Sequence, residues 1–154
     1  MCGIAGSFCN TNSSQNSIVE MINTLRHRGP DDIGVWSDNK KKIFLAHRRL
    51  AIIDLSHNGH QPMTSNSGRY VIIFNGEIYN HMQIRKDFFE GYNWQSTSDT
   101  ETILTSFDKW GIEKSLQFFR GMFAIAVWDK YDQTLTLIRD KFGEKPLYFY
   151  QGSE

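Results

Sequence analysis

The sequence has few cysteines, few prolines and no excess charge of either sign. Only two cysteines, Cys2 and Cys9, occur among 154 residues, so a disulfide framework is excluded. If residues 2–8 form an extended strand, the two thiols lie on opposite faces and far apart, and a bridge between them is not expected. Seventeen basic residues balance seventeen acidic ones, so no overall field draws the chain toward nucleic acid or anionic lipid.

Targeting segments and metal motifs are also lacking. The apolar run after Met1 stops at Phe8 without a basic flank, unlike a signal peptide. No stretch approaches the length that spans a bilayer, and no Cys-x-x-Cys occurs. The five histidines show neither Ser-His-Asp nor metal-ligand spacing: His27, His47, His57, His60 and His81. We therefore expect a cytoplasmic protein without a metal site.

What is present indicates one folded domain. Hydrophobic residues make up 40% of the chain and eleven are phenylalanine, which is typical of a packed core. We predict strands at 2–8, within 42–55, at 69–74 and at 146–150, a hairpin of 121–129 with 133–140, and helices from about 16 to 27, 80 to 90 and 99 to 110. The three lysines at 40–42 are expected in a solvated turn. Strands, then helices, then strands predict antiparallel sheets covered by helices, an α+β fold.

Cys2 stands where removal of Met1 would make it the N-terminal residue. An α-amine has a pKa near 8, close to the value of about 8.5 for a thiol. One residue would then supply both a nucleophile and its base. The alternative is a small buried residue that happens to be cysteine.

A second stretch, Phe74 to Asn80, runs from a buried strand into Asn75-Gly76-Glu77. The amide of Asn75 and the main-chain N–H of Gly76 are two donors one residue apart, as an oxyanion hole requires. The alternative is that Asn-Gly forms a tight turn.

Two charged residues and one charged segment complete the candidates. Arg49 lies between apolar runs, where its guanidinium could hold a carboxylate bidentately. Asp99 could bind an ammonium group, or could simply cap the helix that follows. Together the pair would fit the two ends of a free amino acid. The segment Arg26–Asp32 suits a charged helix end followed by a turn, and residue chemistry alone assigns it no catalytic step.

Eight stretches in collinear order resemble the glutaminase domain of the glutamine-hydrolysing asparagine synthetases, a branch of the class II glutamine amidotransferases. They are MCGIAG, RHRGPDD, AHRRLAIIDLS, GHQPM, FNGEIYN, SDTETIL, GMFAIAVWD and RDKFGEKPLYF. The resemblance covers essentially the whole chain. It implies an N-terminal-nucleophile hydrolase fold, a four-layer αββα sandwich with two antiparallel sheets.

The resemblance also implies roles for individual residues. Cys2 would attack the side-chain amide of glutamine, with Asn75 and Gly76 as oxyanion donors. Water would then hydrolyse the glutamyl thioester to glutamate, with release of ammonia. The implied glutamine-binding residues are Arg49, Leu50, Ala51, Ile52, Ile53, Asn75, Gly76, Glu77 and Asp99. Arg49 would bind the substrate carboxylate, and Asp99 and Glu77 its ammonium group.

Family members carry a second domain that binds ATP, and the chain contains no Ser-Gly-Gly-x-Asp-Ser loop. We therefore expect a glutaminase domain over 1–154, incomplete at its C-terminus and without the synthetase domain. No cofactor is expected here, since ATP and magnesium would belong to the synthetase. The expected partners are L-glutamine, an ATP-dependent synthetase domain or subunit, and a second copy in a homodimer. Two alternatives stay open: ammonia delivery to another acceptor, such as a sugar or cell-envelope carboxylate, and a non-catalytic glutamine-binding regulatory domain.

Overall fold

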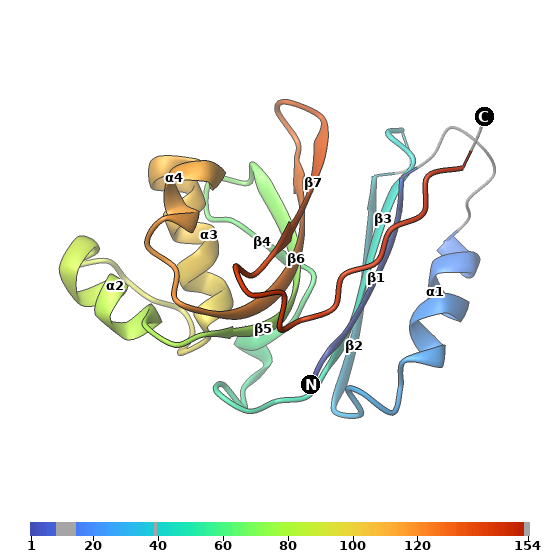
Figure 1. Cartoon of the computed structure of the whole chain (residues 1–154), viewed down its shortest axis with the longest axis horizontal. Helices are drawn as coiled ribbons and strands as arrows, with labels where there is room; N and C mark the ends of the chain where they lie inside the picture. Colours follow the sequence, from blue (N-terminus) through green and yellow to red (C-terminus); the bar gives the residue numbers. More distant parts are fainter. Residues whose placement is uncertain (9–14, 39, 153–154) are drawn as a thin grey trace.

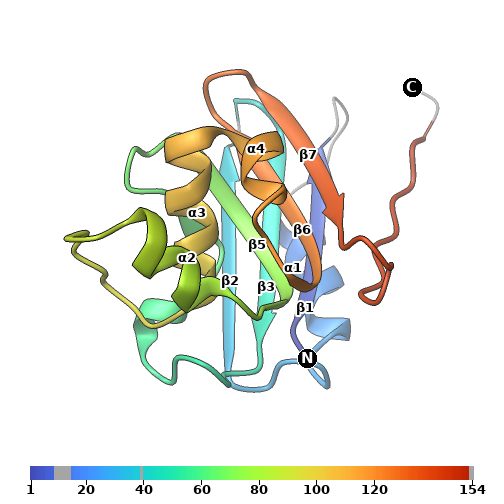
Figure 2. The same cartoon turned by 60° about the vertical axis from the view of Figure 1, so that its left-hand side comes forward.

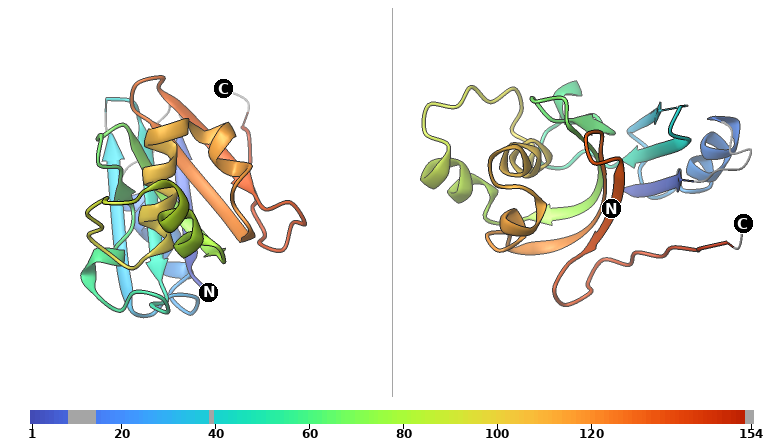
Figure 3. Two further views of the ribbon diagram at one scale, coloured as in Figure 1. Left: turned by 90° about the vertical axis from the view of Figure 1, so that its left-hand side faces the viewer. Right: turned by 90° about the horizontal axis from the view of Figure 1, so that it is seen from above.

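The structure, a computed structural model, describes residues 1–8, 15–38 and 40–152. Its elements form four layers: one helix, two antiparallel sheets packed face to face, and a group of helices (Figure 1). The view from above in Figure 3 shows the same succession of layers. The expected α+β class and the αββα arrangement are thereby confirmed.

Each sheet is built from antiparallel neighbours. The first has the order β1-β3-β2, with β1 Gly3–Phe8, β2 Asp32–Asp38 and β3 Ile43–Arg49. The second has the order β4-β5-β6-β7, with β4 Met63–Thr64, β5 Tyr70–Ile78, β6 Gly121–Asp129 and β7 Thr134–Arg139. The predicted hairpin is β6–β7, and the exposed lysines 40–42 lie in the turn between β2 and β3, as expected.

The helices cover the outer faces of the two sheets. They are α1 Gln15–Thr24, α2 His81–Phe88, α3 Asp99–Trp110 and α4 Ile112–Leu116, with a 3-10 turn, η1, at His57–Gly59. Helix α1 lies on the first sheet, whereas α2, α3 and α4 lie beyond the second (Figures 1 and 2). None of the helices in the described ranges is long and apolar enough to cross a bilayer.

Strands β3 and β5 have both faces buried. Alternate residues of β3 face opposite ways, so Ile43 and Leu45 meet the second sheet while Phe44 and Ala46 meet α1. Strand β5 does the same: one face packs against β3 and the other against α3. This double burial explains the continuous apolar runs in these two strands.

Two predicted strands are wrong. Residues 50–55 form a loop after β3, and Ile52 and Leu55 are 70% and 80% exposed. Residues 146–150 form no strand, and Tyr148 and Tyr150 are at least 90% exposed. In the described part of the chain no strand pairs with this segment, so its backbone groups lack a ladder partner. Strand β2, which pairs along β3, was not predicted.

Candidate active site

Cys2 immediately precedes β1 and lies at one end of the space between the sheets. In β1, Ile4 packs into the cluster between the sheets, so strand parity directs Cys2, two residues earlier, to the same side. The Cys2 Sγ accepts the backbone N–H of Leu50 at 3.4 Å and lies 3.8 Å from the Leu50 carbonyl oxygen. The loop after β3 therefore holds the thiol in place.

The thiol is not intrinsically acidic in this setting. Burial raises the pKa of Cys2, while the Leu50 N–H and the positive charges of the N-terminal amine and Arg49 lower it only in part. A thiol in this environment needs a base to become a nucleophile. Cys9, the other cysteine, lies outside the described residues.

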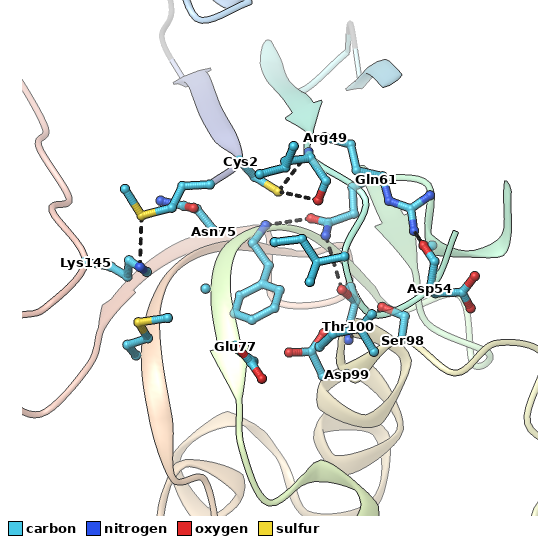
Figure 4. A pocket seen from close by; sticks show the side chains of 18 residues that line it. Cys2, Arg49, Asp54, Gln61, Asn75, Glu77, Ser98, Asp99, Thr100 and Lys145 are labelled. Atoms are coloured by element: carbon cyan, nitrogen blue, oxygen red, sulfur yellow. Dashed lines mark hydrogen bonds between the residues drawn. The ribbon is translucent and has the colours of Figure 1, made fainter. Parts of the chain in front are cut away.

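Asn75 and Gly76 lie within β5, so the alternative of a tight turn is wrong. Asn75 falls on the same face of β5 as Val71 and Ile73, which pack toward the first sheet. Figure 4 shows Cys2 and Asn75 at the same end of one cavity. An added Cβ at Gly76 would lie 2.2 Å from the Met122 carbonyl oxygen, so the close approach of β6 requires glycine there.

The N–H of Gly76 belongs to an edge of β5 whose other donors are already bound. The N–H of Phe74 donates to Gln61 Oε1 at 2.7 Å, and that of Ile78 donates to Asp99 Oδ2 at 2.9 Å. Alternate N–H groups of a strand point to the same edge, so the Gly76 N–H points out between these two bonds. The flanking bonds leave it as the donor directed at the cavity.

Asp99 is the first residue of α3 rather than its cap. Ser98 caps the helix by accepting the N–H of Thr100, so the capping alternative for Asp99 is wrong. Asp99 is 5% exposed, and burial, with a smaller contribution from the charge of Glu77, raises its pKa to about 6. Figure 4 shows Glu77 and Asp99 together, away from Cys2. A buried carboxylate with a second, half-buried carboxylate near it attracts a cation.

Arg49 is buried and bonded to its own loop. Its Nη1 donates to the Ser56 carbonyl at 2.7 Å, and its Nη2 donates to the Asp54 carbonyl. These bonds use two of the five N–H donors of a guanidinium. Arg49 lines the cavity. Its remaining N–H donors are enough to bind a carboxylate.

The cavity, of about 110 Å³, collects all but one of the predicted residues. It is lined by Cys2, Arg49, Leu50, Ile52, Ile53, Asn75, Gly76, Glu77 and Asp99. Ala51 does not line it; its N–H donates to Asp31 Oδ2 at 2.9 Å. Lining residues that sequence reasoning missed are Gln61, Ser98, Thr100, Met122 and Lys145, besides apolar and loop neighbours. Gln61 and Lys145 lie in the quoted stretches GHQPM and RDKFGEKPLYF, which had no assigned role.

The segment Arg26–Asp32 contacts the backbone of two cavity residues, Cys2 and Arg49. The Nε of Arg28 donates to the Cys2 carbonyl at 3.1 Å. The N–H of Asp31 donates to the Arg49 carbonyl at 3.0 Å. An added Cβ at Gly29 would lie 2.4 Å from the Arg48 backbone. This segment therefore positions both Cys2 and the end of β3, a role that sequence reasoning left unassigned.

Comparison with known proteins shows the family of the chain. The family described as "Glutamine amidotransferase domain" matches residues 1–154. The chain belongs to this family. Asparagine synthetase [glutamine-hydrolyzing] 1 of Bacillus subtilis is 39% identical over 97% of this chain and 24% of its own length. Asparagine synthetase B of Escherichia coli is 38% identical over 96% of this chain and 26% of its own length.

A third relative gives a similar match. A putative asparagine synthetase 2 of Methanocaldococcus jannaschii is 36% identical over 97% of this chain and 32% of its own length. This glutamine amidotransferase domain thus spans about a quarter to a third of the curated relatives named here.

Proposed function

We propose that this glutamine amidotransferase domain hydrolyses L-glutamine to glutamate and ammonia through a thioester on Cys2. The observation that carries the proposal is the distribution of groups in one cavity, which Gly76 also lines: the Cys2 thiol and Asn75 at one end, and Asp99 with Glu77 at the other. The spacing suits a substrate whose reacting amide and charged amino-acid end must be held at once.

The first step needs a free amine on Cys2. In the structure Met1 precedes it, and the Met1 Sδ accepts Lys145 Nζ at 3.0 Å. A Cys2 nitrogen in a peptide bond cannot take up a proton, so Met1 must be removed. The freed amine accepts the thiol proton, the Cys2 sulfur bonds to the amide carbon, and the amine returns a proton to the departing ammonia. Water then cleaves the thioester and releases glutamate.

The negative oxygen that forms during attack is stabilised by Asn75 and Gly76. The side-chain amide of Asn75 and the main-chain N–H of Gly76 each donate to it. Arg49 binds the substrate α-carboxylate, and Asp99 with Glu77 binds the α-ammonium. Leu50, Ala51, Ile52 and Ile53 belong to the loop that positions Arg49 and the thiol.

The names of the relatives support a proposal for the ammonia acceptor. We propose that the ammonia passes to an ATP-dependent synthetase, as a domain or subunit, that makes asparagine from aspartate. ATP and magnesium serve that synthetase, and this domain needs no cofactor for glutamine hydrolysis. Association as a homodimer and a cytoplasmic setting, where thiols stay reduced, complete the proposal.

The deciding experiment follows ammonia release and the covalent intermediate together. Met1-free protein is mixed with L-glutamine, quenched in acid and weighed intact; we expect a transient gain of one glutamyl group on Cys2. Cys2→Ala should bind glutamine but release no ammonia. Ammonia release by Cys2→Ala at the wild-type rate would exclude the thioester. The acceptor is tested separately, by identifying the amide product formed with ATP, aspartate and glutamine when the synthetase is present.

A further inference from the structure

Two histidines and an aspartate meet beside the active-site cavity without lining it. His57 begins η1, His60 follows it, and Asp32 begins β2. One donor atom from each lies within 4.8 Å of the other two. The His60 Nδ1 is 2.6 Å from Asp32 Oδ2, and the His57 and His60 rings stack with centroids 5.1 Å apart.

We infer that these three side chains bind a divalent metal ion such as zinc. Two imidazole nitrogens and one carboxylate oxygen form a donor set that zinc accepts, with the remaining position left to water. Two donors that each lie about 2.1 Å from a tetrahedral ion are about 3.4 Å apart. The exposed His57 ring, whose donor atom lies within 4.8 Å of the other two, therefore has to move by up to about 1.4 Å. His60 Nδ1 and Asp32 Oδ2, which are 2.6 Å apart, separate by about 0.8 Å as the ion replaces the hydrogen between them.

The surroundings orient two of the three ligands. The second oxygen of Asp32 accepts the N–H of Ile33 at 2.8 Å, which leaves Oδ2 facing His60. An added Cβ at Gly34 would lie 2.7 Å from His60 Nε2. The missing side chain at Gly34 thus makes room for the ring and directs Nδ1 toward Asp32. Fixed ligand orientation of this kind raises metal affinity.

The site also adjoins the residue that the proposed function assigns to the substrate carboxylate. An added Cβ at Gly59 would lie 2.0 Å from Arg49 Nη2, so η1 packs directly on the guanidinium. Arg49 also donates to Ser56, which precedes η1. An ion bound by His57 and His60 would tie η1 to β2 and thereby restrain the wall behind Arg49.

The test is direct binding of zinc and cobalt to the whole chain, free of any histidine tag and of added metal. Titration calorimetry at pH 7.5 should give one zinc ion per chain with micromolar or tighter affinity. His57→Ala and Asp32→Asn should each weaken binding by more than about tenfold. The matched control is His27→Ala, which removes an exposed histidine that contributes no donor atom to the cluster and should leave the affinity unchanged.

Two further measurements distinguish this site from a metal site elsewhere on the chain. Affinity should fall between pH 7.5 and 5.5, because protonated imidazole does not bind metal. Bound cobalt should show a visible spectrum without the near-ultraviolet band of a thiolate ligand. Unchanged zinc binding in His57→Ala, or binding lost only in Cys2→Ala, would overturn the proposal. Melting curves without metal check that each variant is folded. Because binding is measured without glutamine, the result stands apart from the glutaminase proposal.

Discussion

The Asp99 carboxylate accepts the backbone N–H of Ile78 at 2.9 Å, which joins the start of α3 to the end of β5. This bond holds a buried charge at the end of the cavity away from Cys2. Burial raises the pKa of Asp99 to about 6, so the group is ionised at neutral pH and becomes neutral as the pH falls through 6.

Glutamine binding should therefore weaken in acid. An ionised Asp99 attracts the substrate ammonium and a protonated one does not, so affinity should fall about tenfold per pH unit below 6. The measurement is the Kd of L-glutamine for Cys2→Ala between pH 5 and 8. The substitution removes the thiol, so its titration does not contribute. Asp99→Asn should bind weakly at every pH. A Kd that does not change with pH in Cys2→Ala, in which Asp99 is retained, would contradict the assignment.

Removal of Met1 should be required for activity. Only a free α-amine on Cys2 can take the thiol proton, so the active population should begin at Cys2 by intact mass. A variant with one alanine inserted between Met1 and Cys2 keeps the thiol in the chain but blocks its amine, and should be inactive. Full glutaminase activity in protein that retains Met1 would defeat the mechanism.

Asn75→Ala should lower kcat by about 10²–10³-fold, the usual loss for one oxyanion donor. Binding should change little, because the interaction forms only as the oxygen becomes negative. Steady-state kinetics with L-glutamine separates kcat from KM. If Asn75→Ala raised KM with kcat unchanged, the side chain would be binding the substrate rather than its transition state.

Arg49 should bind the α-carboxylate of the substrate. Truncating one partner of a buried charge pair costs about 2–5 kcal/mol, and a lysine lacks the planar fork of arginine. Arg49→Lys should therefore lose much of its kcat/KM for L-glutamine. Glutaramate, which lacks the α-amine, and D-glutamine should be poor substrates of the unaltered domain. Similar kcat/KM for all three amides would remove Arg49 and Asp99 from substrate recognition.

Asp54 should stabilise the fold through the two loops that flank the cavity. Its Oδ1 accepts the Ser56 hydroxyl at 2.6 Å and its Oδ2 accepts the Thr97 N–H at 2.8 Å. The Ser56 hydroxyl is the main reason that the pKa of Asp54 is lowered to about 2. Asp54→Asn places an amide N–H against one of these donors and should cost about 1–3 kcal/mol at pH 7.

The same loss should depend on pH in a defined direction. A carboxyl whose folded pKa is depressed stabilises the protein above its unfolded pKa of about 4, and this contribution is lost as the pH falls toward 2. Urea unfolding at pH 7, 5 and 3 measures it. The stability difference between wild type and Asp54→Asn should persist at pH 5 and shrink at pH 3; a constant difference would contradict the assignment.

Local pattern was enough to identify several parts of this protein. The 3.6-residue period of 99–110 predicted α3, and the apolar run 69–74 predicted the buried strand that begins β5. Cys2, Asn75, Gly76 and Asp99 could be named as candidates because the chemistry expected of them depends on residue type and on near neighbours in the chain. These features are set by short segments, which the sequence displays directly.

Tertiary structure decided what depends on contacts between distant segments. Residues 50–55 have the apolar composition of a strand, yet they form a loop that Asp31 and Arg49 hold through hydrogen bonds to Ala51 and Asp54. Arg28 reaches Cys2 across 26 positions, and Gln61 and Asp99, from other elements, bind the N–H groups on either side of the Gly76 N–H. Asp32 meets His60 across 28 positions. No local periodicity encodes such pairings, because each exists only when two sheets and their loops have closed around the same space.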